Sequence, residues 1–121
     1  MKPREYLILT ALAGGHLHGL AIARAVEDLS DGRTRLWPVS LYGTLDDLVS
    51  NGFIEELLHD ARQRPPDQSE KKRFYRLTRA GHRALAAETT RLDALVKTAK
   101  SRLKARHGDA GTAMVKATGA K

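Results

Sequence analysis

The sequence contains no cysteine. This absence excludes disulfide bonds, thiol nucleophiles and cysteine-ligated metal sites, and it suits a reducing compartment. The sequence also lacks any apolar run near the ~18 residues that a membrane-spanning helix needs. Residues 6–13 are apolar and follow Lys2 and Arg4, as in a secretory signal, but Glu5 interrupts the positive region and the large side chains recur at helical spacing. We therefore expect a soluble, cytoplasmic protein whose first helix belongs to the core.

Motifs for catalysis are missing as well. His16 and His18 form a His-x-His pair that can begin a metal site, and acidic pairs occur at 46–47 and 55–56. Adjacent residues on a helix point about 100° apart, so neither acidic pair forms a facing pair of carboxylates, and His16 lies in a glycine-rich turn. The sequence has no phosphate-binding glycine loop and no nucleophile motif. We predict that the protein is not an enzyme and has no cofactor or metal.

Positive charge is abundant and unevenly distributed. The chain has 121 residues, which is enough for one domain with a single core. Its formal net charge is +7. Residues 1–60 hold 5 Lys and Arg against 9 Asp and Glu, whereas residues 61–121 hold 16 against 5. A basic second half attracts polyanions such as nucleic acid.

Hydrophobic spacing predicts three short helices in the first half. The first ends at Gly14-Gly15, the second runs from Gly19 to residues 30–32, and the third begins at Pro38 and ends at residues 51–52. Each carries an apolar stripe at three- and four-residue spacing, so the three helices are expected to share one core.

A hairpin and a long helix are predicted to follow. Residues 53–59 and 72–77 are rich in aromatic and branched side chains, and the polar segment between them contains Pro65-Pro66. Thr78 is a suitable N-cap for a helix that extends to about Arg106. From residue 108 onward the chain has almost no large apolar residue, which predicts a disordered tail.

Four segments together resemble the PadR family of transcriptional regulators. They are residues 18–22, 36–48, 51–55 and 74–81, and the resemblance extends over about residues 4–106. Leu20 differs from the aromatic residue frequent in the family, the hairpin tip contains prolines, and Asp46-Asp47 replace more basic or neutral residues. The resemblance implies a mainly α fold with a small β-hairpin wing, a winged helix-turn-helix with a long C-terminal dimerisation helix. The expected parts are a DNA-binding domain at 1–78, the dimerisation helix at 79–107 and the tail at 108–121.

The third helix is then the recognition helix, which must present a polar, sterically modest face to the major groove. Helical geometry turns Ser40 and Gly43 outward, with Tyr42 at the flank. An exposed glycine in the middle of a helix lowers helix stability by roughly 1 kcal/mol relative to alanine. Gly43 therefore either allows the helix to approach DNA closely or is a tolerated substitution without a function. The resemblance implies that Tyr42 donates to a phosphate; the alternative is an aromatic at the core boundary. Trp37 is expected to pack at the edge of the core.

Cations around the predicted wing and before the third helix are candidate phosphate ligands, although a charge run is often only a solvated surface. The predicted DNA-binding set is Ser40, Tyr42, Gly43, Arg33, Arg35, Arg62, Arg64, Lys71, Lys72 and Arg73.

The long helix is expected to pair with its copy in a homodimer, because its apolar stripe exceeds what so small a core can cover. The stripe consists of Leu85, Leu92, Leu95, Val96, Ala99 and Leu103. The alternative is that this helix folds back over the first helix of its own chain. The helix has no aromatic residue to line a pocket for a small-molecule effector, so no ligand site is assigned.

These expectations predict a regulator, a repressor in our interpretation, that binds double-stranded DNA as a homodimer on a pseudo-palindromic operator. A winged-helix adaptor that binds protein instead of DNA is the alternative, and the acidic pair at 46–47 favours it.

Overall fold

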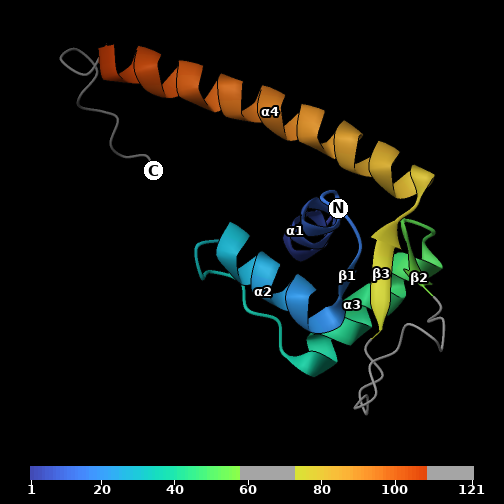
Figure 1. The fold of residues 1–121 in the computed structure, drawn as a ribbon. Coiled ribbons are helices and arrows are strands. Elements are labelled where there is room, and N and C mark those ends of the chain that lie inside the picture. The colour runs from blue at the N-terminus through green and yellow to red at the C-terminus, as the bar shows by residue number, and fades with distance from the viewer. Residues whose placement is uncertain (58–72, 109–121) are drawn as a thin grey trace. The chain divides into compact units, whose positions relative to one another are not determined.

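The computed structural model describes residues 1–57 and 73–108, and the chain divides into two compact units, Met1–Glu88 and Thr89–Lys121. Four helices and three short strands follow one another along the chain (Figure 1). In order they are α1 (Pro3–Leu12), β1 (Leu17–His18), α2 (Gly19–Leu29), α3 (Pro38–Ser50), β2 (Ile54–Leu57), β3 (Phe74–Leu77) and α4 (Arg79–Gly108). The mainly helical fold with a small antiparallel sheet confirms the predicted fold class.

Backbone conformation explains where α2 and α3 end. Asp31 and Gly32 have φ values of 55° and 78°, and Gly52 has a φ of 80°, so the chain leaves each helix through the left-handed region. Pro38 occupies the first turn of α3, where its missing N–H removes no helical hydrogen bond. The predicted ends of these helices are confirmed within one or two residues.

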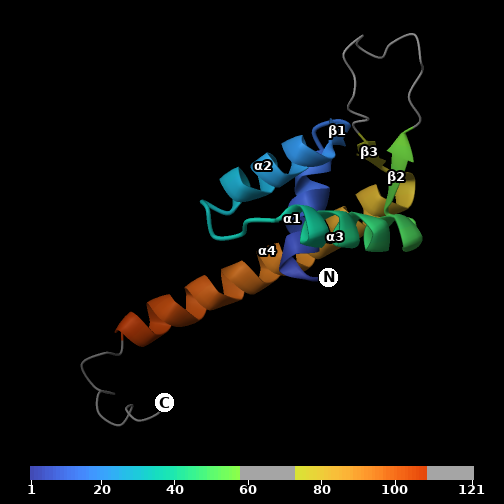
Figure 2. The same ribbon diagram turned by 90° about the horizontal axis from the view of Figure 1, so that it is seen from below.

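The three strands form one antiparallel sheet in the order β1-β3-β2. Ile54 of β2 lies opposite Leu77 of β3, and Leu17 of β1 lies opposite Tyr75. Both views place this sheet beside the cluster formed by α1, α2 and α3 (Figure 2). The strand β1 was not predicted, because two residues are too short to show a sequence period.

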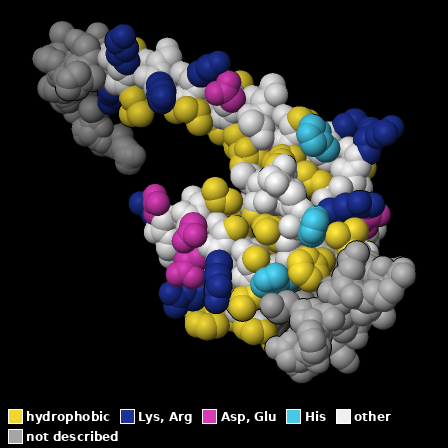
Figure 3. All heavy atoms as spheres, in the orientation of Figure 1, with side chains coloured by type: hydrophobic (Ala, Val, Ile, Leu, Met, Phe, Trp, Pro, Cys, Tyr) yellow, Lys and Arg dark blue, Asp and Glu magenta, His cyan; other side chains and the backbone are white. Residues whose placement is uncertain are grey.

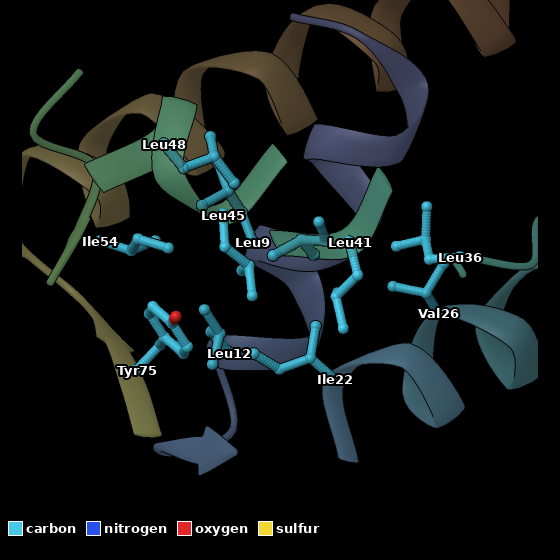
Figure 4. Close-up of a cluster of buried hydrophobic side chains, with 11 residues drawn as sticks. Leu9, Leu12, Ile22, Val26, Leu36, Leu41, Leu45, Leu48, Ile54 and Tyr75 are labelled. Atoms are coloured by element: carbon cyan, nitrogen blue, oxygen red, sulfur yellow. The ribbon is translucent and has the colours of Figure 1, made fainter. Parts of the chain in front are cut away.

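One hydrophobic core joins the first three helices to the sheet. Its members are Ile8, Leu9, Leu12, Ile22, Val26, Leu36, Leu41, Leu45, Leu48, Ile54 and Tyr75. The Tyr75 ring projects from β3 toward Leu12 and Ile54 (Figure 4). Among the described residues the Tyr75 hydroxyl has no hydrogen-bond partner, and burial raises the pKa of Tyr75 to about 12, partly opposed by the positive charge of Arg73. This residue therefore connects the sheet to the helices through its ring.

The start of α4 is fixed to the turn that follows α3. The Thr78 hydroxyl accepts a hydrogen bond from the Gly81 N–H at 3.0 Å and donates to the Gly52 carbonyl at 2.6 Å. Thr78 thus acts as the predicted N-cap. Leu85, about two turns after Thr78, packs against the core of the first unit. The described part of the chain contains no helix long and apolar enough to cross a membrane.

Candidate nucleic-acid interface

The first half of α3 presents an exposed surface with little steric bulk. Leu41, Thr44 and Leu45 are buried, so the helix is anchored by one face only. Val39 and Gly43 lie on the opposite side, and a Cβ built on Gly43 would meet no atom within 4 Å. This surface has the shape that a helix needs to enter a DNA groove.

Ser40 is half-buried at the edge of that surface. Its hydroxyl donates to the Trp37 carbonyl at 3.1 Å, and its own carbonyl accepts from the Thr44 hydroxyl at 2.8 Å. The hydroxyl oxygen keeps the ability to accept a further hydrogen bond. Ser40 thus supports the first turn of α3 and presents an acceptor near its exposed face.

Tyr42 packs against the start of α2. A Cβ built on Gly19 would overlap with the Tyr42 hydroxyl and lie 2.8 Å from Cζ of its ring. Gly19 is buried, so the absence of a side chain at this position lets the Tyr42 ring lie directly against the α2 backbone. Tyr42 is half-buried and packs against the core, which fits the alternative of an aromatic at the core boundary. A hydrogen bond from Tyr42 to a phosphate stays a prediction.

Arg73 links the sheet to α3. Its guanidinium donates two hydrogen bonds to the Glu56 carboxylate, both at 3.1 Å, and lies 3.5 Å from Oδ1 of Asp46. It also lies over the Tyr42 ring, 5.2 Å from the centroid. The hydrogen bonds to Glu56 are the main reason that the pKa of Arg73 is raised above its ordinary value.

The position of Arg73 changes the interpretation of the acidic pair at 46–47. The Arg73 guanidinium forms an ion pair with Asp46, for which the sequence alone suggests no cationic partner, and a bidentate ion pair with Glu56. These contacts lie 27 and 17 residues apart in sequence, and no local pattern indicates them. The charge of Arg73 is therefore shared with two carboxylates in the free protein.

Arg35 and Trp37 lie at the entry to α3. The Arg35 guanidinium pairs with Glu27 of α2 at 2.9 Å and lies 5.6 Å from the centroid of the Trp37 ring. The hydrogen bond to Glu27 raises the pKa of Arg35. Trp37 is 64% exposed, so the expectation that it packs at the edge of the core is wrong. Its position as the N-cap residue of α3, with an extended backbone, directs the side chain away from the core.

Several predicted residues contribute differently or cannot be placed. Arg33 is exposed in the segment between α2 and α3. Arg62, Arg64, Lys71 and Lys72 lie outside the described residues, so only Arg73 represents the wing cations here. Of the predicted cations, the structure therefore describes Arg33 and Arg35 before α3 and Arg73 beside β3.

The sequence profile of the PadR-like family of transcriptional regulators matches residues 8–87, which include the second half of α1, the whole of α2 and α3, and the sheet. The chain belongs to this PadR-like family. This family is one of transcriptional regulators.

Known proteins similar to this PadR-like chain include one curated relative and several solved structures. An uncharacterised 37.1 kDa protein of transposon TN4556 from Streptomyces fradiae is 46% identical over 61 residues, which is 50% of this chain and 17% of that protein. The chain thus spans a small part of that relative's length.

Two solved structures share the fold at low sequence identity. A PadR family regulator from Clostridium difficile R20291 has a TM-score of 0.68 and 18% identity, with 84% of this chain and 99% of that chain covered. Bacillus subtilis PadR, solved in complex with operator DNA, has a TM-score of 0.59 and 24% identity, with 73% and 47% covered.

His16 and His18 of the PadR-like chain have structural contacts. Nδ1 of His18 accepts a hydrogen bond from the Ala21 N–H at 3.3 Å and so caps α2. The rings of His16 and His18 both lie edge-on to Phe74, with centroids 5.9 and 5.5 Å away. Within residues 1–57 and 73–108, no group of three or more histidine and acidic side chains is arranged to hold a metal ion.

The apolar stripe of α4 divides between two environments. Leu85 packs against the core of the first unit, whereas Leu95, Val96 and Leu103 are exposed in the single chain. Hydrophobic side chains follow one edge of this helix, and Lys and Arg side chains cover other parts of its surface (Figure 3). Leu92 is half-buried and Ala99 exposed. The stripe beyond Leu85 therefore has apolar surface available to a partner.

Proposed function

We propose that this PadR-like chain is a transcriptional repressor that binds a pseudo-palindromic operator as a homodimer, with α3 in the major groove. The observation that carries the proposal is the one-sided burial of α3, which leaves Val39 and Gly43 exposed while Leu41 and Leu45 hold the helix in the core. A recognition helix needs this division between a packed face and a free face.

Cations near α3 supply the attraction to phosphate. Arg33 and Arg35 precede the helix, and Arg62, Arg64, Lys71 and Lys72 belong to the segment between β2 and β3. The Arg35–Glu27 pair is exposed, and such pairs contribute little to stability, so Arg35 can exchange its carboxylate for a phosphate at small cost. Arg73 acts chiefly by holding Tyr42 in place and adds its charge at the edge of the interface.

The homodimer rests on the exposed apolar residues of α4. Leu92, Leu95, Val96, Ala99 and Leu103 fall within a stripe about 100° wide on a helix with 3.6 residues per turn. A copy of the same helix is the partner that two-fold symmetry provides, and it sets two recognition helices about 34 Å apart, one turn of DNA. Bacillus subtilis PadR, which has a similar fold, was solved in complex with operator DNA, and this supports DNA as the ligand proposed here.

A winged-helix adaptor without DNA binding remains the competing hypothesis, and its main support was the acidic pair at 46–47. Since Asp46 lies 3.5 Å from the Arg73 guanidinium, its charge is partly matched within the chain. The structure therefore weakens the reason for preferring a protein partner.

Binding to duplex DNA as a function of salt distinguishes the two hypotheses. The full chain is titrated into duplexes selected from a random pool, and fluorescence anisotropy gives the affinity at several salt concentrations. Changing Arg62, Arg64, Lys71 and Lys72 to Gln should flatten the slope of log K against log salt by up to about 0.9 for each lost phosphate contact.

The matched control removes the same charge elsewhere. Changing Lys97, Lys100, Arg102 and Lys104 of α4 to Gln should leave the slope nearly unchanged. If both sets of substitutions flatten the slope of log K against log salt equally, only the net charge matters. The assignment of phosphate contacts to the wing cations is then wrong. Absence of binding to every duplex at low salt supports the adaptor. Transcription from a promoter that contains the selected site should fall when the protein is added, and a rise contradicts repression.

A further inference from the structure

Large hydrophobic side chains are exposed where α3 begins. Val39 is 88% exposed and Trp37 is 64% exposed. Leu20 of α2 is also exposed, and together with Trp37 and Pro38 it lines a surface depression of about 400 Å³. Hydrophobic side chains gather on the surface of this part of the molecule, next to charged ones (Figure 3). Leu20, Trp37 and Pro38 thus share one depression at the start of α3, and Val39 follows them in the chain.

Folding of the single chain does not account for Val39. It occupies the second position of α3, and it is not among the residues of the hydrophobic core or those packed against it. A β-branched residue is also a poorer helix former than alanine. Val39 therefore contributes exposed apolar surface in the first turn of α3, where a helix that enters DNA meets the bases, and it has no compensating role in the core.

The chemistry of the major groove limits what such a side chain can recognise. Valine has no hydrogen-bond donor or acceptor, so it cannot distinguish the polar edges of the bases. The 5-methyl group of thymine is the apolar feature of the major groove, and small apolar side chains contact it. The residues at the N-terminus of a recognition helix are the ones that reach base edges.

We propose that Val39 recognises the 5-methyl group of a thymine in each operator half-site. This inference rests on the proposed function, since it requires α3 to lie in the major groove, and it assigns a specific base feature to a specific side chain. Trp37, two residues before Val39, is also exposed, and its ring lies 5.6 Å from the Arg35 guanidinium. The selected operator should accordingly hold an A·T pair under Val39 in both half-sites.

Replacement of thymine by deoxyuridine tests the proposal, because it removes the methyl group and keeps the base pair. Each thymine of a selected operator is replaced in turn, symmetrically in the two half-sites. At one position the wild-type affinity should fall about three- to fivefold for each methyl group lost, the effect expected from one buried methyl. Val39→Ala should bind the thymine and deoxyuridine duplexes with nearly equal affinity.

Val49→Ala is the matched control, because Val49 is also exposed but lies at the other end of α3. This variant should distinguish thymine from deoxyuridine as the wild type does. If no replacement weakens wild-type binding, or if Val39→Ala keeps the full discrimination, the proposal is wrong although DNA binding stands. If no duplex binds at all, the proposed function itself has failed.

The emission of Trp37 gives a second, independent test, since it is the only tryptophan in the sequence. Addition of the selected duplex should change the intensity or wavelength of this emission, because the exposed indole becomes covered. An unchanged spectrum, measured while anisotropy reports a bound duplex, places the start of α3 away from DNA and overturns the proposal.

Discussion

Gly43 has an open environment in the middle of α3, and a Cβ there would meet nothing within 4 Å. Alanine is the better helix former, so Gly43→Ala should raise the free energy of unfolding by about 0.5–1 kcal/mol. The same methyl group should lower the affinity for duplex DNA if the glycine permits a close approach to the bases. Urea unfolding and anisotropy titration measure the two effects separately.

Ser50→Ala is the control for Gly43→Ala, because Ser50 is exposed on the same helix but at its C-terminal end. It should leave duplex affinity unchanged. If Gly43→Ala is more stable than the wild type and binds DNA as tightly, the glycine has no role in DNA binding.

Tyr75 makes stability depend on alkaline pH. Burial raises its pKa from 10.0 to about 12 in the folded chain, so the unfolded chain loses the phenolic proton first as the pH rises. The contribution of the neutral phenol is therefore fully present below pH 10 and is lost as the pH approaches 12. Tyr75→Phe should remove this part of the alkaline decline, which is on the order of 1–3 kcal/mol.

Urea unfolding of the wild type and Tyr75→Phe at pH 8 and at pH 11 measures this difference. At pH 8 the variant should be as stable as the wild type or slightly more stable, because no hydrogen bond of the Tyr75 hydroxyl is found among the described residues. If the free energy of unfolding falls by the same amount in both proteins between pH 8 and pH 11, the pKa of Tyr75 is not raised in the folded chain.

At the scale of elements, the junction of the sheet with α4 depends on close backbone contact. A Cβ on Gly81 would overlap with the carbonyl of Phe53, and this carbonyl also accepts a hydrogen bond from the Thr78 N–H at 3.0 Å. Gly81→Ala should therefore lower the free energy of unfolding by about 1–3 kcal/mol, as overpacking does elsewhere. Gly43→Ala, the same substitution at an open helical position, should have the opposite sign. Equal effects on urea unfolding at the two positions argue against a steric cause.

The sequence predicts the elements that have a strong local signal. Residues with left-handed backbone, three of them glycines, follow the ends of α1, α2 and α3, and Thr78 caps α4 as expected. The strand β1 was missed, because it exists only through its pairing with β3. Gly19 carried no visible sign of its role, which is to admit the ring of Tyr42.

The candidate site is less predictable than the fold, since its side chains are positioned by contacts distant in sequence. Periodicity predicted that Ser40 and Gly43 both face outward; Gly43 is exposed, whereas Ser40 is half-buried. It could not show that Arg73 bridges Glu56 and Asp46, because three separate elements supply these groups. Trp37 was misplaced for a related reason: hydrophobicity favours the core, whereas the extended N-cap backbone directs the ring outward.

At the scale of the whole molecule, net charge and assembly act together on DNA affinity. Residues 61–121 contain 16 Lys and Arg and only 5 Asp and Glu, so the proposed dimer would bring a large positive charge to one duplex. A single small domain contacts few bases. Two linked domains gain affinity because the second binding event is intramolecular, and this gain disappears if the chains separate.

Leu95→Asp tests the assembly of the two chains. Leu95 is 56% exposed in the single chain, so the substitution should leave the fold of Met1–Glu88 intact. In the proposed dimer it places a carboxylate within the apolar stripe, where burial of an unpaired charge is costly. We expect monomers in sedimentation at about 10 μM, with operator affinity reduced at least tenfold, in line with lost bivalency.

Ser101→Asp provides the control for Leu95→Asp, because it adds the same charge to α4 on the side about 180° from the stripe. It should sediment as a dimer and bind the operator like the wild type. A wild-type chain that is already monomeric at tens of micromolar leaves the fold-back of α4 as the better hypothesis. A Leu95→Asp variant that remains dimeric excludes this stripe as the interface, and the two recognition helices then need another surface to hold them one turn of DNA apart.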